Sequence, residues 1–240
     1  MHLRNITLNS DRFPTTEVYP FNIPLFRTTR ILEFHAPVTF FVGENGSGKS
    51  TLLKAIARRC GIHLWGEIER ARFEYNPYEE ELHRALEIEW VDGPIPGSFF
   101  ASQTFRNFAS ILDEWASTDP GQLDYFGGHS LMNLSHGQSL MSYFRSRYRI
   151  LGLYFLDEPE TALSPKSQLE LLSVLTDMSS DGHAQFVIAS HSPLLLACHD
   201  AEIYSFDTAP VSKIHYEDTE HYRVYRDFME NREKYLKGSE

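Results

Sequence analysis

A nine-residue stretch, GENGSGKST over residues 43–51, has the residue types and spacing that can hold a phosphate chain. It fits the pattern G-x-x-x-x-G-K-[ST] and lies between a predicted strand and a predicted helix, the context that this motif requires. Its glycines let the backbone turn several N–H groups inward toward phosphate oxygens, and the positive end of the following helix adds to the attraction. A glycine-rich turn without a ligand is the alternative, but average residue usage makes a chance match to this pattern rare.

Two side chains of this loop have specific chemistry to offer. Lys49 carries the only positive charge of the stretch, and it would bridge the β- and γ-phosphates of a nucleoside triphosphate. The Ser50 hydroxyl is suited to ligate the accompanying Mg²⁺. The residues expected to form the phosphate site are Gly43, Glu44, Asn45, Gly46, Ser47, Gly48, Lys49, Ser50 and Thr51.

A pair of carboxylates follows an apolar run further along the chain, in LYFLDEPE over residues 153–160. Asp157 fits the residue that holds the Mg²⁺ shell through water. Glu158 is placed to polarise an attacking water as a general base, a role that typically contributes about 10²–10⁴ in rate. A solvated turn after a strand is the alternative, and the phosphate loop upstream disfavours it.

The elements that must position these groups alternate between strand and helix. Apolar strands without alternation, separated by helices, indicate a mainly parallel sheet that is covered on both faces. The N-terminal strands suggest a smaller antiparallel β portion. We expect strands over residues 2–8, 30–34, 38–42, 85–91, 150–157, 185–190 and 201–207, and helices over 49–60, 165–178 and 219–237.

The organisation predicts a single α/β domain over residues 1–240. Its nucleotide-binding core comprises residues 1–97 and 150–240. Between them, residues 98–149 have apolar residues at helical spacing and are expected to form a helical insertion. The predicted fold class is α/β, with the mainly parallel sheet of a P-loop NTPase.

Composition narrows the function classes. The chain has 22 basic and 33 acidic residues, a formal net charge of −11. A body this acidic repels a phosphate backbone on average, so binding of a nucleic acid would need a local basic patch. Two cysteines form no disulfide framework, and no apolar run reaches the roughly 20 residues of a membrane helix. We expect a soluble, cytoplasmic protein.

Four segments, in this order, resemble the motifs of the ABC-type ATPases: GENGSGKST, NLSHGQ, LYFLDEPE and VIASHSP. The resemblance spans about residues 30–200. It implies Mg²⁺-dependent hydrolysis of ATP in a head-to-tail dimer, with two ATP molecules held between the copies. Each phosphate loop then faces the signature loop of the partner. It also implies an ABC-ATPase type of sheet and a signature-bearing helical insertion.

The resemblance assigns further site residues. His191 matches the switch histidine that contacts the γ-phosphate, and Gln103 resembles the glutamine that reaches Mg²⁺ and the attacking water. In NLSHGQ, Ser135, Gly137 and Gln138 match residues of the signature loop that bind the partner's nucleotide. His136 replaces a glycine of the family pattern. It either points away from the nucleotide or adds a pH-sensitive donor beside it.

Departures from the transporter pattern point to a branch of the family. Glu160 follows the proline of DEPE where transporters usually have threonine, and Ser192 follows His191 where they usually have aspartate. These residues resemble the soluble SMC and RecF-like proteins and small bacterial or phage ATPases. Only 82 residues separate Thr51 from Leu134 and they lack heptads, so a long coiled coil has no room.

Three functions are therefore open. The leading one is a stand-alone ATPase whose ATP-driven dimerisation is a switch for an unknown protein partner; DNA-associated or defence-related work fits the branch by analogy alone. The second is an ATP-binding subunit docked on a membrane transporter. The third is a regulatory module that binds ATP without turnover, which the presence of Glu158 disfavours.

Overall fold

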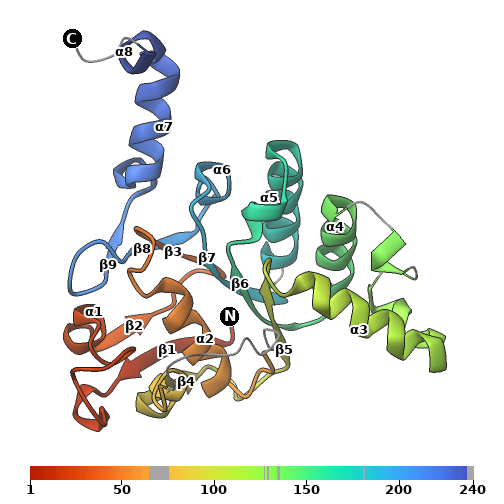
Figure 1. The fold of residues 1–240 in the computed structure, drawn as a ribbon, viewed down its shortest axis with the longest axis horizontal. Coiled ribbons are helices and arrows are strands. Elements are labelled where there is room, and N and C mark those ends of the chain that lie inside the picture. The colour runs from red at the N-terminus through yellow and green to blue at the C-terminus, as the bar shows by residue number, and fades with distance from the viewer. Residues whose placement is uncertain (65–75, 127, 129, 134–135, 181, 237–240) are drawn as a thin grey trace.

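Two β-sheets organise the chain in the computed structural model, which describes residues 1–64, 76–126, 128, 130–133, 136–180 and 182–236. The larger sheet has six strands in the order β5-β6-β7-β3-β8-β9, all parallel except β9, which pairs antiparallel with β8. Its strands are β3 (Val38–Val42), β5 (Gly97–Ala101), β6 (Gly152–Asp157), β7 (Ala184–Ala189), β8 (Glu202–Ser205) and β9 (Ser212–Ile214). Figure 1 shows this sheet at the centre of the molecule.

A smaller antiparallel sheet with the order β2-β1-β4 lies beside it (Figure 1). Its strands are β1 (Leu3–Leu8), β2 (Ile31–Glu33) and β4 (Leu86–Trp90). The expected fold class is confirmed, because a mainly parallel sheet and a separate antiparallel sheet are both present.

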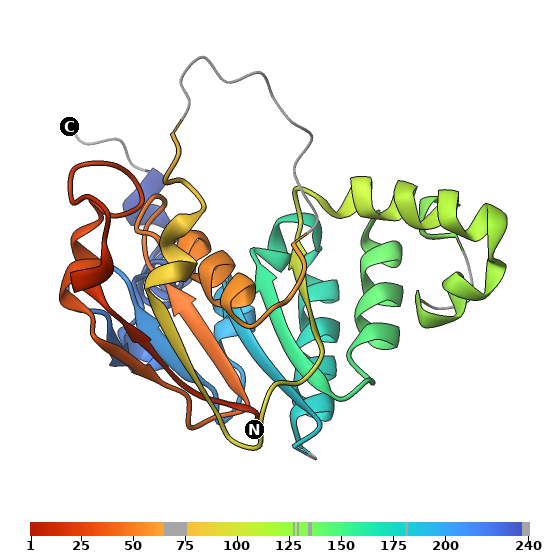
Figure 2. The ribbon, with the colours of Figure 1, turned by 90° about the horizontal axis from the view of Figure 1, so that it is seen from below.

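Helices cover both faces of the large sheet, which explains why its strands are apolar without alternation. Neighbouring residues of β6 enter different cores: Phe155 packs with α2, whereas Leu156 packs with α3, α4, α5 and α6. Figure 2 shows the helices on the two sides of the sheet. These α-helices are α2 (Lys49–Arg59), α3 (Phe105–Thr118), α4 (His136–Arg147), α5 (Pro165–Ser180) and α6 (Pro193–Leu196).

Short helices complete the connections. The remaining N-terminal α-helix is α1 (Pro24–Thr28), and the 3-10 helices are η1 (Ser10–Arg12), η2 (Glu81–Ala85), η3 (Pro120–Phe126), η4 (Leu131–Asn133), η5 (Pro159–Ala162) and η6 (Tyr216–Asp218).

The predicted start of the helical insertion needs correction. The insertion expected over 98–149 begins with β5, because the apolar pair Phe99 and Phe100 adds a strand to β6, and helix starts only at Phe105.

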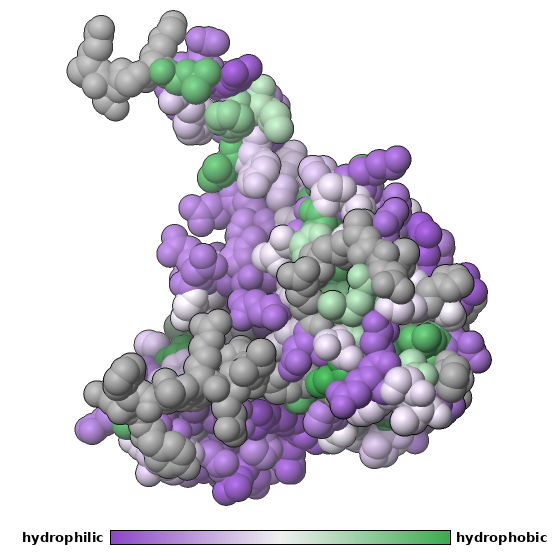
Figure 3. Space-filling model, turned by 45° about the vertical axis from the view of Figure 1, so that its right-hand side comes forward, coloured by the Kyte–Doolittle hydropathy of each residue, from purple (hydrophilic) through white to green (hydrophobic). Residues whose placement is uncertain are grey.

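The C-terminal segment forms an arm rather than one continuous helix. The helix expected over 219–237 is divided into α7 (Glu220–Glu230) and α8 (Arg232–Leu236), because Asn231 leaves the helical conformation. The arm projects from the body (Figure 1), and Figure 3 shows apolar surface on it. Its exposed apolar residues are Val224, Tyr225, Phe228, Met229, Tyr235 and Leu236. Within the described ranges, no helix has the length and apolarity needed to cross a bilayer.

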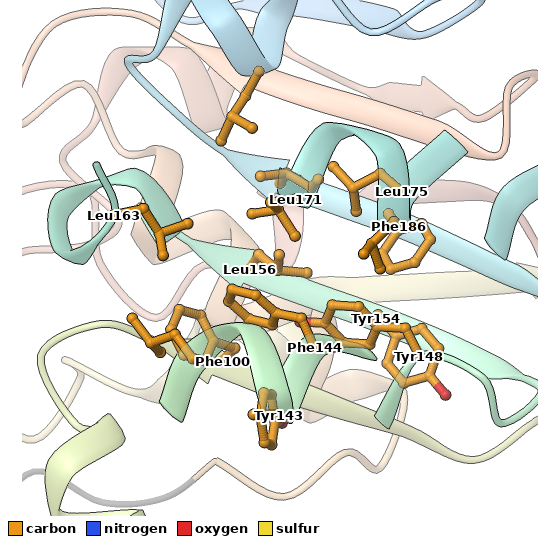
Figure 4. Packing of buried hydrophobic residues seen from close by; sticks show 14 of the residues in the cluster. Phe100, Tyr143, Phe144, Tyr148, Tyr154, Leu156, Leu163, Leu171, Leu175 and Phe186 are labelled. Carbon is orange, nitrogen blue, oxygen red and sulfur yellow. The ribbon is translucent and has the colours of Figure 1, made fainter. Parts of the chain in front are cut away.

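Aromatic packing fixes α4 against the large sheet. Phe144 is fully buried, with its ring centroid 4.9 Å from that of Phe100 and 5.4 Å from that of Tyr148. Figure 4 shows these rings between α4 and the strands. The insertion and the core are therefore held together as one hydrophobic unit.

Replacing Phe144 with alanine should lower the free energy of unfolding by about 3–5 kcal/mol, because it leaves a cavity among these rings. Urea unfolding followed by circular dichroism measures the change. Leu169→Ala on α5 is the control, since Leu169 is 50% exposed and its loss should stay within about 0.5 kcal/mol. Equal effects in both variants would contradict the described packing.

Candidate functional site

The carboxyl ends of the parallel strands bring the predicted chemical groups to one edge of the sheet. Asp157 at the end of β6 pairs in register with Ala101 of β5 on one side and with Ala189 of β7 on the other. Ala189 in turn pairs with Phe41 of β3, one residue before that strand ends. The loops that follow these strands therefore meet, and ligands of open α/β sheets bind at such an edge.

The phosphate loop has the conformation that its glycines predict. Gly43 and Gly48 have positive φ angles of 142° and 103°. A Cβ on Gly48 would lie 2.9 Å from the Phe26 ring, and a Cβ on Gly43 would lie 2.9 Å from Asp207 Oδ1. Side chains at these positions would be strained and would collide, so the loop accepts only glycine there.

Lys49 lies inside the loop. It is only 4% exposed, and its Nζ donates to the carbonyl oxygens of Gly43 at 2.7 Å and Glu44 at 2.8 Å. Burial lowers the pKa of Lys49, against the opposing effect of Glu158 and other nearby carboxylates. Among the described residues, the buried Ser47 hydroxyl of the same loop has no hydrogen-bond partner. The loop thus offers an inward cation and an unsatisfied donor, as a phosphate ligand requires.

Ser50 and Asp157 form the pair that the sequence predicts for Mg²⁺. The Ser50 hydroxyl donates to Asp157 Oδ1 at 2.6 Å, across 107 positions of sequence. Burial raises the pKa of Asp157, although the hydrogen bond from Ser50 opposes that shift. The part of the chain that the structure describes has no group of three His, Cys, Asp or Glu side chains placed to hold a metal. One hydroxyl and one carboxylate fit Mg²⁺, which takes its other ligands from water and substrate phosphates.

Glu158 follows Asp157 in a strained conformation that its backbone contacts maintain. Its φ is 48°, in the left-handed region that non-glycine residues rarely adopt. Its N–H donates to Ala189 O at 2.9 Å, while its carbonyl accepts from Ser102 Oγ at 2.7 Å and Thr161 Oγ1 at 3.0 Å. These bonds turn the Glu158 side chain out of the strand and toward His191.

His191 lies directly beyond β7 and faces Glu158. Its Nε2 is 3.7 Å from Glu158 Oε1 and has no hydrogen-bond partner among the described residues. Its backbone N–H donates to Glu160 Oε1 at 2.5 Å, and its Nδ1 lies 2.9 Å from Nε2 of His221 on α7. Burial lowers the pKa of His191, and the charge of Lys49 lowers it further. The ring therefore lies between a carboxylate and a second imidazole, and its burial favours the neutral form.

Gln103 is exposed and lies in the turn after β5, next to the strand that ends in Asp157. Its assignment as a ligand of Mg²⁺ and of the attacking water stays a prediction. The neighbouring Ser102 donates a hydrogen bond to the Glu158 carbonyl and so links this turn to the end of β6.

The signature residues lie elsewhere in the fold. Ser135 is outside the described residues, while Gly137 and Gln138 are in the first turn of α4. α4 packs on the face of the sheet opposite to α2, which follows the phosphate loop. The contact of Gly137 and Gln138 with nucleotide stays a prediction. One copy of the chain does not bring these two residues beside its own Lys49.

Sequence reasoning missed three contacts of this site. In the sequence, Glu160 stands out only as a departure from the transporter pattern, yet its carboxylate accepts a hydrogen bond from the His191 backbone. Tyr19 is 40% exposed and its hydroxyl pairs with Thr51 Oγ1 at 2.7 Å. His221 had no signal in the sequence, because a histidine in a C-terminal helix has no motif that would place it here.

Two family models match the chain. Residues 138–197 match the family described as "AAA domain, putative AbiEii toxin, Type IV TA system", and residues 21–74 match an AAA domain. The first covers most of α4, all of β6 and His191. The second includes the whole phosphate loop.

Two curated relatives and a solved structure are similar to this chain over more of its length than either family model. The chain is 25% identical over 178 residues to a probable siderophore transport system ATP-binding protein, YusV, of Bacillus subtilis, covering 68% of this chain and 64% of the relative. It is 24% identical to the petrobactin import ATP-binding protein FpuD of Bacillus anthracis, covering 69% and 65%. The chain thus spans just under two thirds of these relatives. A structure described as "an inward-facing conformation of a putative metal-chelate type ABC transporter" aligns with a TM-score of 0.53 at 17% identity, over 94% of this chain and 88% of that one.

The fold resembles that of ABC-type ATPases, and the phosphate loop with the Ser50–Asp157 pair has the geometry of a P-loop nucleotide site. Both family models that match parts of the chain describe AAA domains, which agrees with a P-loop ATPase.

Proposed function

We propose that the chain binds MgATP and hydrolyses it to ADP and phosphate between two copies arranged head to tail, as a switch for a partner. One observation carries the chemistry. Lys49, Ser50, Asp157, Glu158 and His191 come from three separate segments, and the strand ends gather them at one edge of the sheet.

Four of these residues then have definite tasks. On binding, Lys49 exchanges its two carbonyl acceptors in the loop for phosphate oxygens and supplies a full charge to them. Mg²⁺, held through Ser50 and Asp157, would neutralise charge that develops on the β- and γ-oxygens. The Glu158 carboxylate accepts a proton as the oxygen of a water molecule bonds to the γ-phosphorus. The bond from that phosphorus to the bridging oxygen breaks, which leaves ADP and inorganic phosphate.

The head-to-tail pairing is supported by what one copy lacks. The N-terminus of α4 offers backbone N–H groups suited to an anion, but it belongs to the opposite face of the sheet from the phosphate loop. A second copy, related by a two-fold axis, can bring its α4 to the open side of the first copy's loop. Each of the two sites then draws on both chains.

Gly137→Arg tests this pairing without disturbing the isolated chain, because no heavy atom lies within 4 Å of a Cβ built at Gly137. The variant should bind MgATP with unchanged affinity but should not form dimers, as Ser135→Arg also should not. Ser180→Arg, at the far end of α5, is the matched control and should dimerise normally. Sedimentation velocity with MgATP measures the dimerisation of Gly137→Arg and of the control. Normal dimerisation of Gly137→Arg would contradict the proposed interface.

A transporter subunit is the second candidate, favoured by the names of the two curated relatives. Such a subunit would be recovered with an integral membrane protein, and its ATPase rate would depend on that protein. Full ATP-dependent dimerisation and turnover by the purified chain would favour the stand-alone switch. Phosphate release from the purified chain also distinguishes either enzyme from a module that only binds ATP.

A further inference from the structure

The contact between His191 and His221 joins the C-terminal arm to the edge of the sheet at which Lys49, Asp157 and Glu158 lie. His221 lies in the first turn of α7, 30 residues beyond His191, and its Nε2 is 2.9 Å from His191 Nδ1. The two ring centroids are 5.0 Å apart. None of the sequence motifs includes this second histidine.

The other side of the His191 ring decides which atom of the pair carries the proton. Nε2 faces Glu158 Oε1 at 3.7 Å, and an ionised carboxylate can only accept a hydrogen bond. A lone pair on Nε2 would be repelled there, so Nε2 carries the proton. In a neutral imidazole, Nδ1 then has the lone pair, and the proton between the rings must belong to His221 Nε2.

The surroundings favour the neutral form of both rings. Burial is the main cause that lowers the pKa of His191 and of His221, and the charge of Lys49 lowers both further. Glu158 and Asp207 oppose these shifts at His191, and Asp207 and Glu220 oppose them at His221. The pair therefore shares one hydrogen bond with a defined direction.

The root of α7 is fixed to the same loop as His191. The Tyr216 hydroxyl donates to the carbonyl of Pro193, two residues beyond His191, at 3.0 Å. Thr219 caps α7 by accepting from the Tyr222 N–H at 3.2 Å, and the Tyr216 and Tyr222 rings pack 4.7 Å apart. The His221 ring is thus held in place by its own backbone and by the loop that it contacts.

We infer that His221 is a positioning residue, which donates to His191 Nδ1 and so keeps the Nε2 proton of His191 directed at Glu158 and the nucleotide edge. A shift of α7 would break this bond and release the tautomer, so the arm is coupled to the nucleotide site. This role in hydrolysis rests on the proposed function, whereas the tautomer itself does not.

Nitrogen NMR of the ¹⁵N-histidine-labelled full chain tests the tautomer without nucleotide, with the His191 signals assigned from a His191→Gln sample. In the wild type, we expect a protonated Nε2 and an unprotonated Nδ1. His221→Ala should give a mixture of the two tautomers. His221→Gln should retain the wild-type pattern, because its amide nitrogen can donate from about the same position.

Steady-state kinetics then tests the coupling to hydrolysis. His221→Ala should lower kcat about three- to tenfold, the change expected from the loss of one net hydrogen bond, with KM for MgATP within about twofold. His221→Gln should restore most of kcat. A wild-type His191 protonated on Nδ1, or a tautomer unchanged in His221→Ala, would overturn the inference. An inactive wild-type chain with the expected NMR pattern would instead contradict the proposed function and leave the tautomer assignment standing.

Discussion

Lys49→Ala should bind MgATP about 10- to 100-fold more weakly than the wild type and should lose measurable turnover. Lys49 Nζ already points at the loop carbonyls of Gly43 and Glu44, where it supplies the loop's own positive charge. Charge-assisted hydrogen bonds of this kind are worth about 1.5–3 kcal/mol, which gives the stated range of affinity. Isothermal titration calorimetry with MgATP measures the loss.

A matched control separates this effect from a general loss of charge. Arg59→Ala removes one positive charge from the other end of the same helix, about 15 Å from Lys49 at the rise of an α-helix. Its affinity should stay within about twofold of the wild type. Normal hydrolysis by Lys49→Ala would show that the phosphate site has been assigned to the wrong residues.

Glu158→Gln should bind MgATP as tightly as the wild type and should hydrolyse it about 10²–10⁴ times more slowly. Glutamine keeps the shape of the side chain but removes the carboxylate that accepts the proton of water. The φ of 48° and the backbone bonds from Ser102 and Thr161 do not depend on that charge, so the loop should keep its conformation. Phosphate release under single-turnover conditions measures the chemical step.

Asp177→Asn is the control for this variant. Asp177 is exposed in the last part of α5, away from the catalytic edge, so its replacement should leave the rate unchanged. A Glu158→Gln chain that retains more than about a tenth of the wild-type rate would exclude Glu158 as the general base.

The features that the sequence could predict are those formed by contiguous residues. The phosphate loop and the acidic strand end are contiguous stretches, so their residue types reveal strand, turn and role together. The largely apolar sequences of β3 and β6, without alternation, predict a sheet covered on both faces, and the structure has one. The antiparallel strands near the N-terminus were also predicted within one or two residues.

Other features depend on contacts that no short stretch contains. β5 has five residues next to a turn, and only its pairing with β6 makes it a strand. Helical periodicity predicted α7 but not where its first turn packs, so the contact of His221 with His191 could not be foreseen. The proposed contact of the signature loop with a second copy cannot be seen in one copy of the chain, so the nucleotide-binding roles of Gly137 and Gln138 stay predictions.

Size-exclusion chromatography of Glu158→Gln with and without MgATP tests the central claim most directly. The variant keeps the nucleotide, so the sandwich of two chains should accumulate. We predict an apparent mass twice that of the chain with MgATP, and the mass of one chain with ADP or with EDTA added. A single-chain profile at concentrations where calorimetry shows saturated MgATP binding would contradict the head-to-tail ATPase.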